Sequence, residues 1–136
     1  MKKVFFLAVL SLIITSPLVA HADNGMWHKI ALNKEHVVSI SADPVQPSTL
    51  YAVTSMGLLK SIDRGRNWTK LKGELPSDIP PSAVAVNPFN SQEIFVGFDG
   101  RGIFKSNDGG STWASLNDGL QNLYVRCIVI SPKAPN

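Results

Sequence analysis

The sequence predicts an all-β protein built from repeated units of four short strands. Three observations support this prediction. An eight-residue pattern occurs twice, 45 residues apart. An Asp-Pro, Asn-Pro or Ser-Pro dipeptide recurs every 44 residues, at Pro44, Pro88 and Pro132. Between these markers lie runs of four to five residues rich in β-branched and aromatic side chains, bounded by Gly, Pro, Asn and Asp, a pattern typical of strands and tight turns.

The eight-residue pattern is Ser-x-Asp-x-Gly-x-x-Trp, and the residues before it repeat as well. Gly57-Leu-Leu-Lys60 matches Gly102-Ile-Phe-Lys105 at the same spacing. We call each copy of the eight-residue pattern a box. The two boxes agree at every defined position and their preceding residues match, which indicates an internal repeat. The pattern residues are Ser61, Asp63, Gly65 and Trp68 in the first copy and Ser106, Asp108, Gly110 and Trp113 in the second.

Each repeat predicts four strands, and no ten-residue window after residue 22 carries a helical stripe. Four strands in about 45 residues are typical of one blade of a β-propeller. The prolines recur after 44 residues and the boxes after 45. The extra residue falls in the turn between the second and third strands, where insertions are tolerated. The first strand of each repeat is expected to lead up to the proline at 44, 88 or 132. The second strands are expected at 50–53 and 94–97, the third at 57–61 and 102–106, and the fourth at 68–71 and 113–116.

These strands divide the chain into predicted units. Blades are expected at 37–72 and 82–117, and a further blade begins within 125–136. Residues 27–35 predict an isolated fourth strand, because Trp27-His-Lys-Ile30 matches Trp68-Thr-Lys-Leu71 with no box before it. A propeller needs about four to eight blades. The segment 23–136 is therefore expected to form a partial propeller of about two and a half blades, which closes a ring through self-association or through blades missing from a truncated chain.

Residues 1–22 predict a signal peptide. Lys2 and Lys3 precede an apolar run, and Ala20-His21-Ala22 supplies the small residues that a signal peptidase reads. Pro17, just before that site, favours cleavage over a membrane anchor. The mature chain is expected to be exported, to the periplasm or the extracellular space, with no membrane span.

The charge of the mature chain excludes a nucleic-acid partner. Removing residues 1–22 lowers the count of Lys and Arg from 13 to 11, against 10 Asp and Glu, so the net charge falls to about +1. A phosphate-binding surface needs a basic stripe that this chain lacks. Cys127 is the only cysteine, so it forms no internal disulfide. Its apolar neighbours Val125, Ile128 and Ile130 predict that it is buried.

The boxes resemble the Asp-box (BNR) repeat of bacterial sialidases, sortilin-type receptors, xyloglucan hydrolases and photosystem II assembly-factor-like propellers. The resemblance extends over residues 27 to 132. It implies a propeller fold, and it implies little about activity, because one fold supports unrelated functions.

Turn chemistry explains the residues of the box. The aspartates, Asp63 and Asp108, are expected to accept hydrogen bonds from nearby backbone N–H groups, and the glycines to adopt positive φ. The tryptophans bury a large ring against the sheet. A structural role is therefore expected for the boxes in place of a catalytic or calcium-binding one, and Asp108→Ala should impair folding without removing a specific chemistry.

No catalytic constellation is recognised in the sequence. A sialidase would need an arginine cluster with an activated tyrosine, and a xyloglucan hydrolase would need acidic residues from two domains. His28 and His36 are expected to be surface residues. No metal site and no cofactor are expected. The residue types that a sialidase or a xyloglucan hydrolase would need occur at Arg64, Arg66, Arg101, Arg126, Tyr51 and Tyr124, and at the loop aspartates Asp23, Asp43, Asp78, Asp99 and Asp118.

The sequence therefore predicts a non-enzymatic segment with a protein-binding, glycan-binding or assembly role and an unidentified ligand. The loops at 72–81 and 99–102 are its expected variable surface, although plain connectors remain an alternative for them. The alternative function is a fragment of a glycoside hydrolase, of the sialidase or the xyloglucan-hydrolase type.

Overall fold

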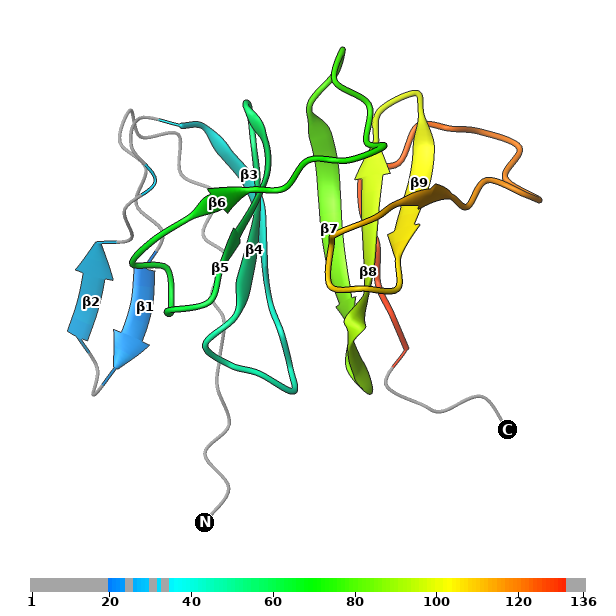
Figure 1. Ribbon diagram of the computed structural model, residues 1–136. Helices are drawn as coiled ribbons and strands as arrows, with labels where there is room; N and C mark the ends of the chain where they lie inside the picture. Colours follow the sequence, from blue (N-terminus) through cyan, green and yellow to red (C-terminus); the bar gives the residue numbers. More distant parts are fainter. Residues whose placement is uncertain (1–19, 24–25, 30–31, 33–34, 132–136) are drawn as a thin grey trace.

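The computed structural model describes residues 20–23, 26–29, 32 and 35–131, and every structural statement below concerns these residues. Two four-stranded antiparallel sheets stand side by side (Figure 1). The first sheet contains β3 (Val37–Ala42), β4 (Leu50–Thr54), β5 (Gly57–Ser61) and β6 (Thr69–Lys70). The second contains β7 (Pro81–Asn87), β8 (Asn90–Phe98), β9 (Gly102–Ser106) and β10 (Ala114–Ser115).

The strands of each sheet follow one another in sequence order, as expected for a chain that folds back at every turn. The described part of the chain contains no helix. The predicted all-β class with four-stranded antiparallel blades is therefore confirmed. The predicted insertion is confirmed as well, because two residues join β4 to β5 whereas three join β8 to β9.

The main core lies between the two sheets. Side chains alternate between the faces of a strand, so Val53 points toward the second sheet while its neighbour Ala52 faces the other way. Each large side chain buried in this way stabilises the fold by about 1.5–3 kcal/mol. The core is formed by Tyr51, Val53 and Leu58 of the first sheet and by Val84, Val86, Ile94, Val96, Phe98 and Trp113 of the second.

The opposite face of the first sheet carries a smaller cluster. Leu32, Ala52 and Leu59 are buried there, and Trp68 packs against them half-buried. Trp68 thus meets the residues preceding its sheet, and Trp113 meets the first sheet. The two tryptophans occupy equivalent places in successive repeats.

Polar contacts also join the sheets. Asp43, which is 1% exposed, accepts hydrogen bonds through Oδ1 from the Ser91 hydroxyl at 2.8 Å and from two backbone N–H groups of its own turn. The Lys60 ammonium donates to the Gly109 carbonyl at 2.9 Å. These bonds connect the start of β8 and the β9–β10 turn to the first sheet.

The chain after β10 returns along the second sheet. Tyr124 forms an isolated bridge with Asp99, and the Val125 N–H donates to the Phe98 carbonyl at 3.1 Å. The Ser82 hydroxyl donates to the Val125 carbonyl. A methyl group at Gly97 would lie 2.5 Å from Val125 Cγ1, so this segment packs directly on β8. The beginning of a further blade within 125–136 stays a prediction, and residues 132–136 lie outside the described part.

The prediction that Cys127 is buried is wrong, because the structure places Cys127 on the surface. Residues 125–131 form no described strand, so no sheet face covers the thiol. The apolar neighbours were a poor guide because Val125 and Ile128, not Cys127, point toward Gly97.

At the other end, β2 (Met26–Lys29) pairs with β1 (Ala20–Asp23) in a two-stranded hairpin. The predicted isolated fourth strand at 27–35 overlaps β2, and its assignment to a blade stays a prediction. The predicted signal peptide lies outside the described residues up to residue 19, and its last three residues belong to β1. Within the described residues, no helix is long and apolar enough to cross a membrane.

Replacing Trp113 tests the contact between the sheets. We expect Trp113→Ala to lower the free energy of unfolding by about 3–5 kcal/mol, because the indole is 5% exposed and its loss opens a cavity in the core. Urea denaturation followed by circular dichroism measures the change. Phe89→Ala, at a side chain 61% exposed, is the control and should change stability by no more than about 0.5 kcal/mol. Equal stability of the two variants would contradict the packing described.

Candidate functional site

Antiparallel strand order separates the turns into two sets at opposite edges of the sheets. We call one set the box edge; it comprises 43–49, 62–68, 88–89 and 107–113. We call the other the loop edge; it comprises 55–56, 71–80, 99–101 and 116–124. The loop edge lies uppermost in Figure 1. Both predicted variable loops, 72–81 and 99–102, fall mainly on the loop edge, and both repeated boxes fall on the box edge.

The first box is a closed network of hydrogen bonds. The Ser61 hydroxyl donates to Asp63 Oδ1 at 2.8 Å and accepts from the Gly65 N–H at 2.8 Å. Asp63 also accepts from the backbone N–H of Asn67 at 2.9 Å and from its side-chain amide at 2.6 Å. Hydrogen bonds from Asn67 and Ser61 lower the pKa of Asp63 to about 2, because they stabilise the ionised form.

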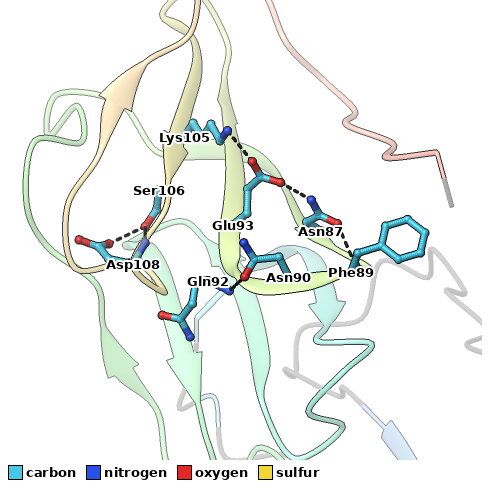
Figure 2. Close-up of polar contacts among 8 residues, drawn as sticks. All are labelled: Asn87, Phe89, Asn90, Gln92, Glu93, Lys105, Ser106 and Asp108. Atoms are coloured by element: carbon cyan, nitrogen blue, oxygen red, sulfur yellow. Dashed lines mark hydrogen bonds and ion pairs between the residues drawn. The ribbon is translucent and has the colours of Figure 1, made fainter. Parts of the chain in front are cut away.

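The second box repeats this network. The Ser106 hydroxyl donates to Asp108 Oδ1 at 2.7 Å (Figure 2) and accepts from the Gly110 N–H at 2.9 Å. Asp108 accepts two further bonds from Thr112, at 2.9 Å from the backbone and 2.6 Å from the hydroxyl. These bonds hold the pKa of Asp108 far below its ordinary value. Each box carboxylate thus accepts hydrogen bonds from residues of its own turn.

Backbone geometry explains the glycine of each box. Gly65 and Gly110 have φ of +83° and +96°, in the left-handed region that L side chains resist. At Gly110 a Cβ atom would also approach Leu71 Cδ1 to 2.7 Å. The second box therefore sits tightly against the end of the first sheet.

The tryptophans of the boxes differ in burial. The indole N–H of Trp68 donates to the Gly65 carbonyl at 3.0 Å within its own box. Trp113 packs with Tyr51 and Val53 of the first sheet. It also contacts the linker that follows that sheet, since its backbone N–H donates to Glu74 Oε2 at 3.1 Å and its ring lies beside Gly73. The box thereby positions a tryptophan between the two sheets.

Two ion pairs between solvent-exposed side chains lie at the loop edge. Arg101 forms an ion pair with Asp78 at 2.5 Å, and both side chains are more than half exposed. This pair joins the two loops predicted to be variable. The hydrogen bond from the Arg101 guanidinium lowers the pKa of Asp78, because it stabilises the ionised carboxylate. Arg126 lies 4.0 Å from Asp99 in a second pair.

A groove of about 430 Å³ opens at this edge between the two sheets. Its walls are the β4–β5 turn and the linker from β6 to β7, with Phe98 at its side. Lys72 and Asp78 are among the charged residues that line it. Pro76 and Pro80 of the linker and Pro81 at the start of β7 restrict the backbone that lines the groove.

The structure does not bring together a sialidase-type site within the described residues. Arg64 and Arg66 are exposed on the box edge, whereas Arg101 lies on the loop edge. Burial raises the pKa of Tyr51 to about 12, with a smaller contribution from Asp43, so this tyrosine is not an activated nucleophile. No group of three or more metal-ligating side chains occurs among the described residues. Sequence reasoning missed the Asp78–Arg101 pair, since its members are 23 residues apart.

No family model matches this chain. Similar curated proteins are xyloglucanases. The xyloglucanase of Hypocrea jecorina is 29% identical over an alignment of 113 residues that covers 71% of this chain and 13% of that protein. Xyloglucanase Xgh74A of Acetivibrio thermocellus is 30% identical over an alignment of 97 residues that covers 59% of this chain and 12% of that protein. The chain thus spans about an eighth of the length of these relatives.

Solved structures lead to the same group. An ancestral GH74 enzyme superposes with a TM-score of 0.55 at 34% identity, covering 61% of this chain and 10% of that one. The GH74 enzyme of Niastella koreensis superposes at 0.50 and 25% identity, covering 65% and 16%. The GH74 xyloglucanase of Xanthomonas campestris, at 0.53 and 20% identity over 61% and 15%, supports the fold. The predicted β-propeller architecture is thereby supported.

These comparisons correct the functional prediction. The expectation of a non-enzymatic module is wrong, because the similar proteins are enzymes. The alternative, a fragment of a glycoside hydrolase of the xyloglucan-hydrolase type, is better supported. The repeated boxes did not determine the function, because one fold supports unrelated activities.

The pKa values of the box carboxylates predict an acid-sensitive stability. Since the pKa of Asp63 falls from 3.8 to about 2 on folding, its stabilisation is complete above pH 3.8 and is lost as the pH falls through about 2. The double variant Asp63→Asn/Asp108→Asn should therefore lose less of its melting temperature than the wild type between pH 5 and pH 2. Thermal denaturation across that range measures this difference.

Asp118→Asn provides the control, because it makes the same Asp-to-Asn change, with the loss of one charge, at an exposed loop residue. It should follow the wild-type pH dependence. A double box variant whose melting temperature falls as steeply as that of the wild type would refute the role of the two carboxylates.

Proposed function

We propose that this chain supplies blades to a propeller that hydrolyses xyloglucan, and that its loop edge faces the glycan. The observation that carries the proposal is the similarity to xyloglucanases over 71% of the chain. Xyloglucan is a neutral polysaccharide, and a surface that binds it needs hydrogen-bonding groups without a large net charge. The pairs Asp78–Arg101 and Asp99–Arg126 meet that requirement on the loop edge.

The loop edge also offers carboxylates for glycoside hydrolysis. Such hydrolysis generally requires two carboxyl groups on either side of the scissile bond, one protonated and one ionised. Asp78 suits the ionised role, because Arg101 lowers its pKa and disfavours the protonated form. Asp99 and Asp118 are the other exposed aspartates of this edge. The boxes are a poor alternative, since the hydrogen bonds of their own turns occupy Asp63 and Asp108.

Two finer assignments accompany the proposal. We infer that the boxes are structural Asp-box turns, in which Ser61, Asp63, Gly65 and Trp68, and likewise Ser106, Asp108, Gly110 and Trp113, form the turn and place the tryptophan. We also infer that residues 1–22 direct export. A polysaccharide does not cross the cell membrane, so its hydrolase must act outside the cytoplasm.

Affinity electrophoresis of the full chain tests the proposal. The chain should migrate more slowly in a native gel that contains xyloglucan than in a gel without polysaccharide, because its loop edge binds the glycan reversibly. A gel containing sialylated mucin is the control for the sialidase-type alternative and should not retard the chain. Equal mobility in the xyloglucan gel and the plain gel would overturn the proposal.

A further inference from the structure

We propose that Tyr124 is a stacking platform for a sugar ring of a neutral glucan chain on the loop edge. This inference rests on the proposed function and assigns a binding residue to it. Of the two tyrosines, Tyr51 is 1% exposed inside the core, whereas Tyr124 is 67% exposed. An aromatic ring that folding leaves in water offers a large apolar surface to a ligand.

The ring of Tyr124 lies beside the Gly100 turn. A Cβ atom at Gly100 would lie 3.6 Å from Tyr124 Cε1 and 3.8 Å from Cζ, which is van der Waals distance. Gly100 has a φ of +100° and lies in the β8–β9 turn, where it presents no side chain to the ring. The ring thus lies next to the turn while two thirds of the residue stays exposed.

The backbone around Tyr124 is tied down on both sides. The Leu123 carbonyl accepts hydrogen bonds from the N–H groups of Gly100 at 3.0 Å and Gly102 at 2.9 Å. The next residue along, Val125, donates to the Phe98 carbonyl at 3.1 Å. The Tyr124 N–H itself donates to Asn122 Oδ1 at 2.9 Å. An aromatic group held in this way loses little freedom on binding, which favours affinity.

The groups beside the ring match a neutral sugar. A pyranose ring presents a face of C–H groups, whose partial positive charge suits the electron-rich face of an aromatic ring, and hydroxyl groups around its rim. Asp99 pairs with Tyr124 through the backbone bridge, and its carboxylate lies 4.0 Å from the Arg126 guanidinium. These two groups can accept from and donate to rim hydroxyls. Because their charges balance, they do not favour an anionic glycan.

Two exposed aromatic side chains on opposite edges allow a matched experiment. Tyr124→Ala removes the platform on the loop edge. Phe89→Ala removes a side chain that is 61% exposed in the β7–β8 turn, on the box edge, where its ring points away from the polar cluster of Asn87 and Glu93 (Figure 2). We expect Tyr124→Ala to weaken the association of the full chain with xyloglucan about tenfold, as the loss of one aromatic contact implies. Phe89→Ala should bind as the wild type does.

Two further variants separate stacking from folding. Tyr124→Trp keeps an aromatic face and should retain binding. Tyr124→Leu keeps an apolar side chain that can cover Gly100 but lacks the ring, so it should preserve the melting temperature and lose the affinity. Binding by Tyr124→Leu at the wild-type level would overturn the platform, as would equal losses in Tyr124→Ala and Phe89→Ala. If the wild type itself shows no retardation by xyloglucan, the proposed function fails, which distinguishes that result from failure of the platform alone.

Discussion

The apolar face that β4 and β5 present to β7 and β8 holds together elements that would otherwise have no fixed relation. Short strands of two to nine residues bury little surface by themselves. Packing the two sheets face to face removes Val53, Ile94 and Val96 from water entirely. Trp113 then closes the contact near the end of the first sheet. The groove on the loop edge exists only because this contact fixes the distance between the β4–β5 turn and the linker that follows β6.

The repeated boxes serve that same contact from the opposite edge. Their serines and aspartates satisfy backbone N–H groups that a sharp turn leaves without partners, and their glycines permit the left-handed backbone that the turn requires. The second box is pressed against Leu71 and receives a hydrogen bond from Lys60 at Gly109, so its geometry determines where Trp113 lies. The box edge thereby builds the blade and leaves the loop edge free to vary in sequence.

The repeated residues lie on the box edge and not on the loop edge. This separation explains why the fold was predicted correctly and the function wrongly. The residues that recur in the sequence are those that every blade needs, and they lie on the box edge. The turns that contain Asp99 to Arg101 and Asp78 lie on the loop edge and do not repeat in the sequence. Similarity to xyloglucanases over 71% of the chain therefore revised the functional conclusion without changing the assignment of any strand.

The sequence by itself determined the elements whose causes are local. The spacing of the prolines and boxes, the strands at 57–61 and 102–106, and the extra residue in the β8–β9 turn were all predictable, because turn residues and alternating side chains act over a few neighbours. Only the tertiary structure decided which side chains meet. The pairing of Asp78 with Arg101, the position of Tyr124 beside Gly100 and the exposure of Cys127 depend on how distant segments of the chain pack against one another. These contacts join segments far apart in the sequence, and no local pattern encodes the distance between them.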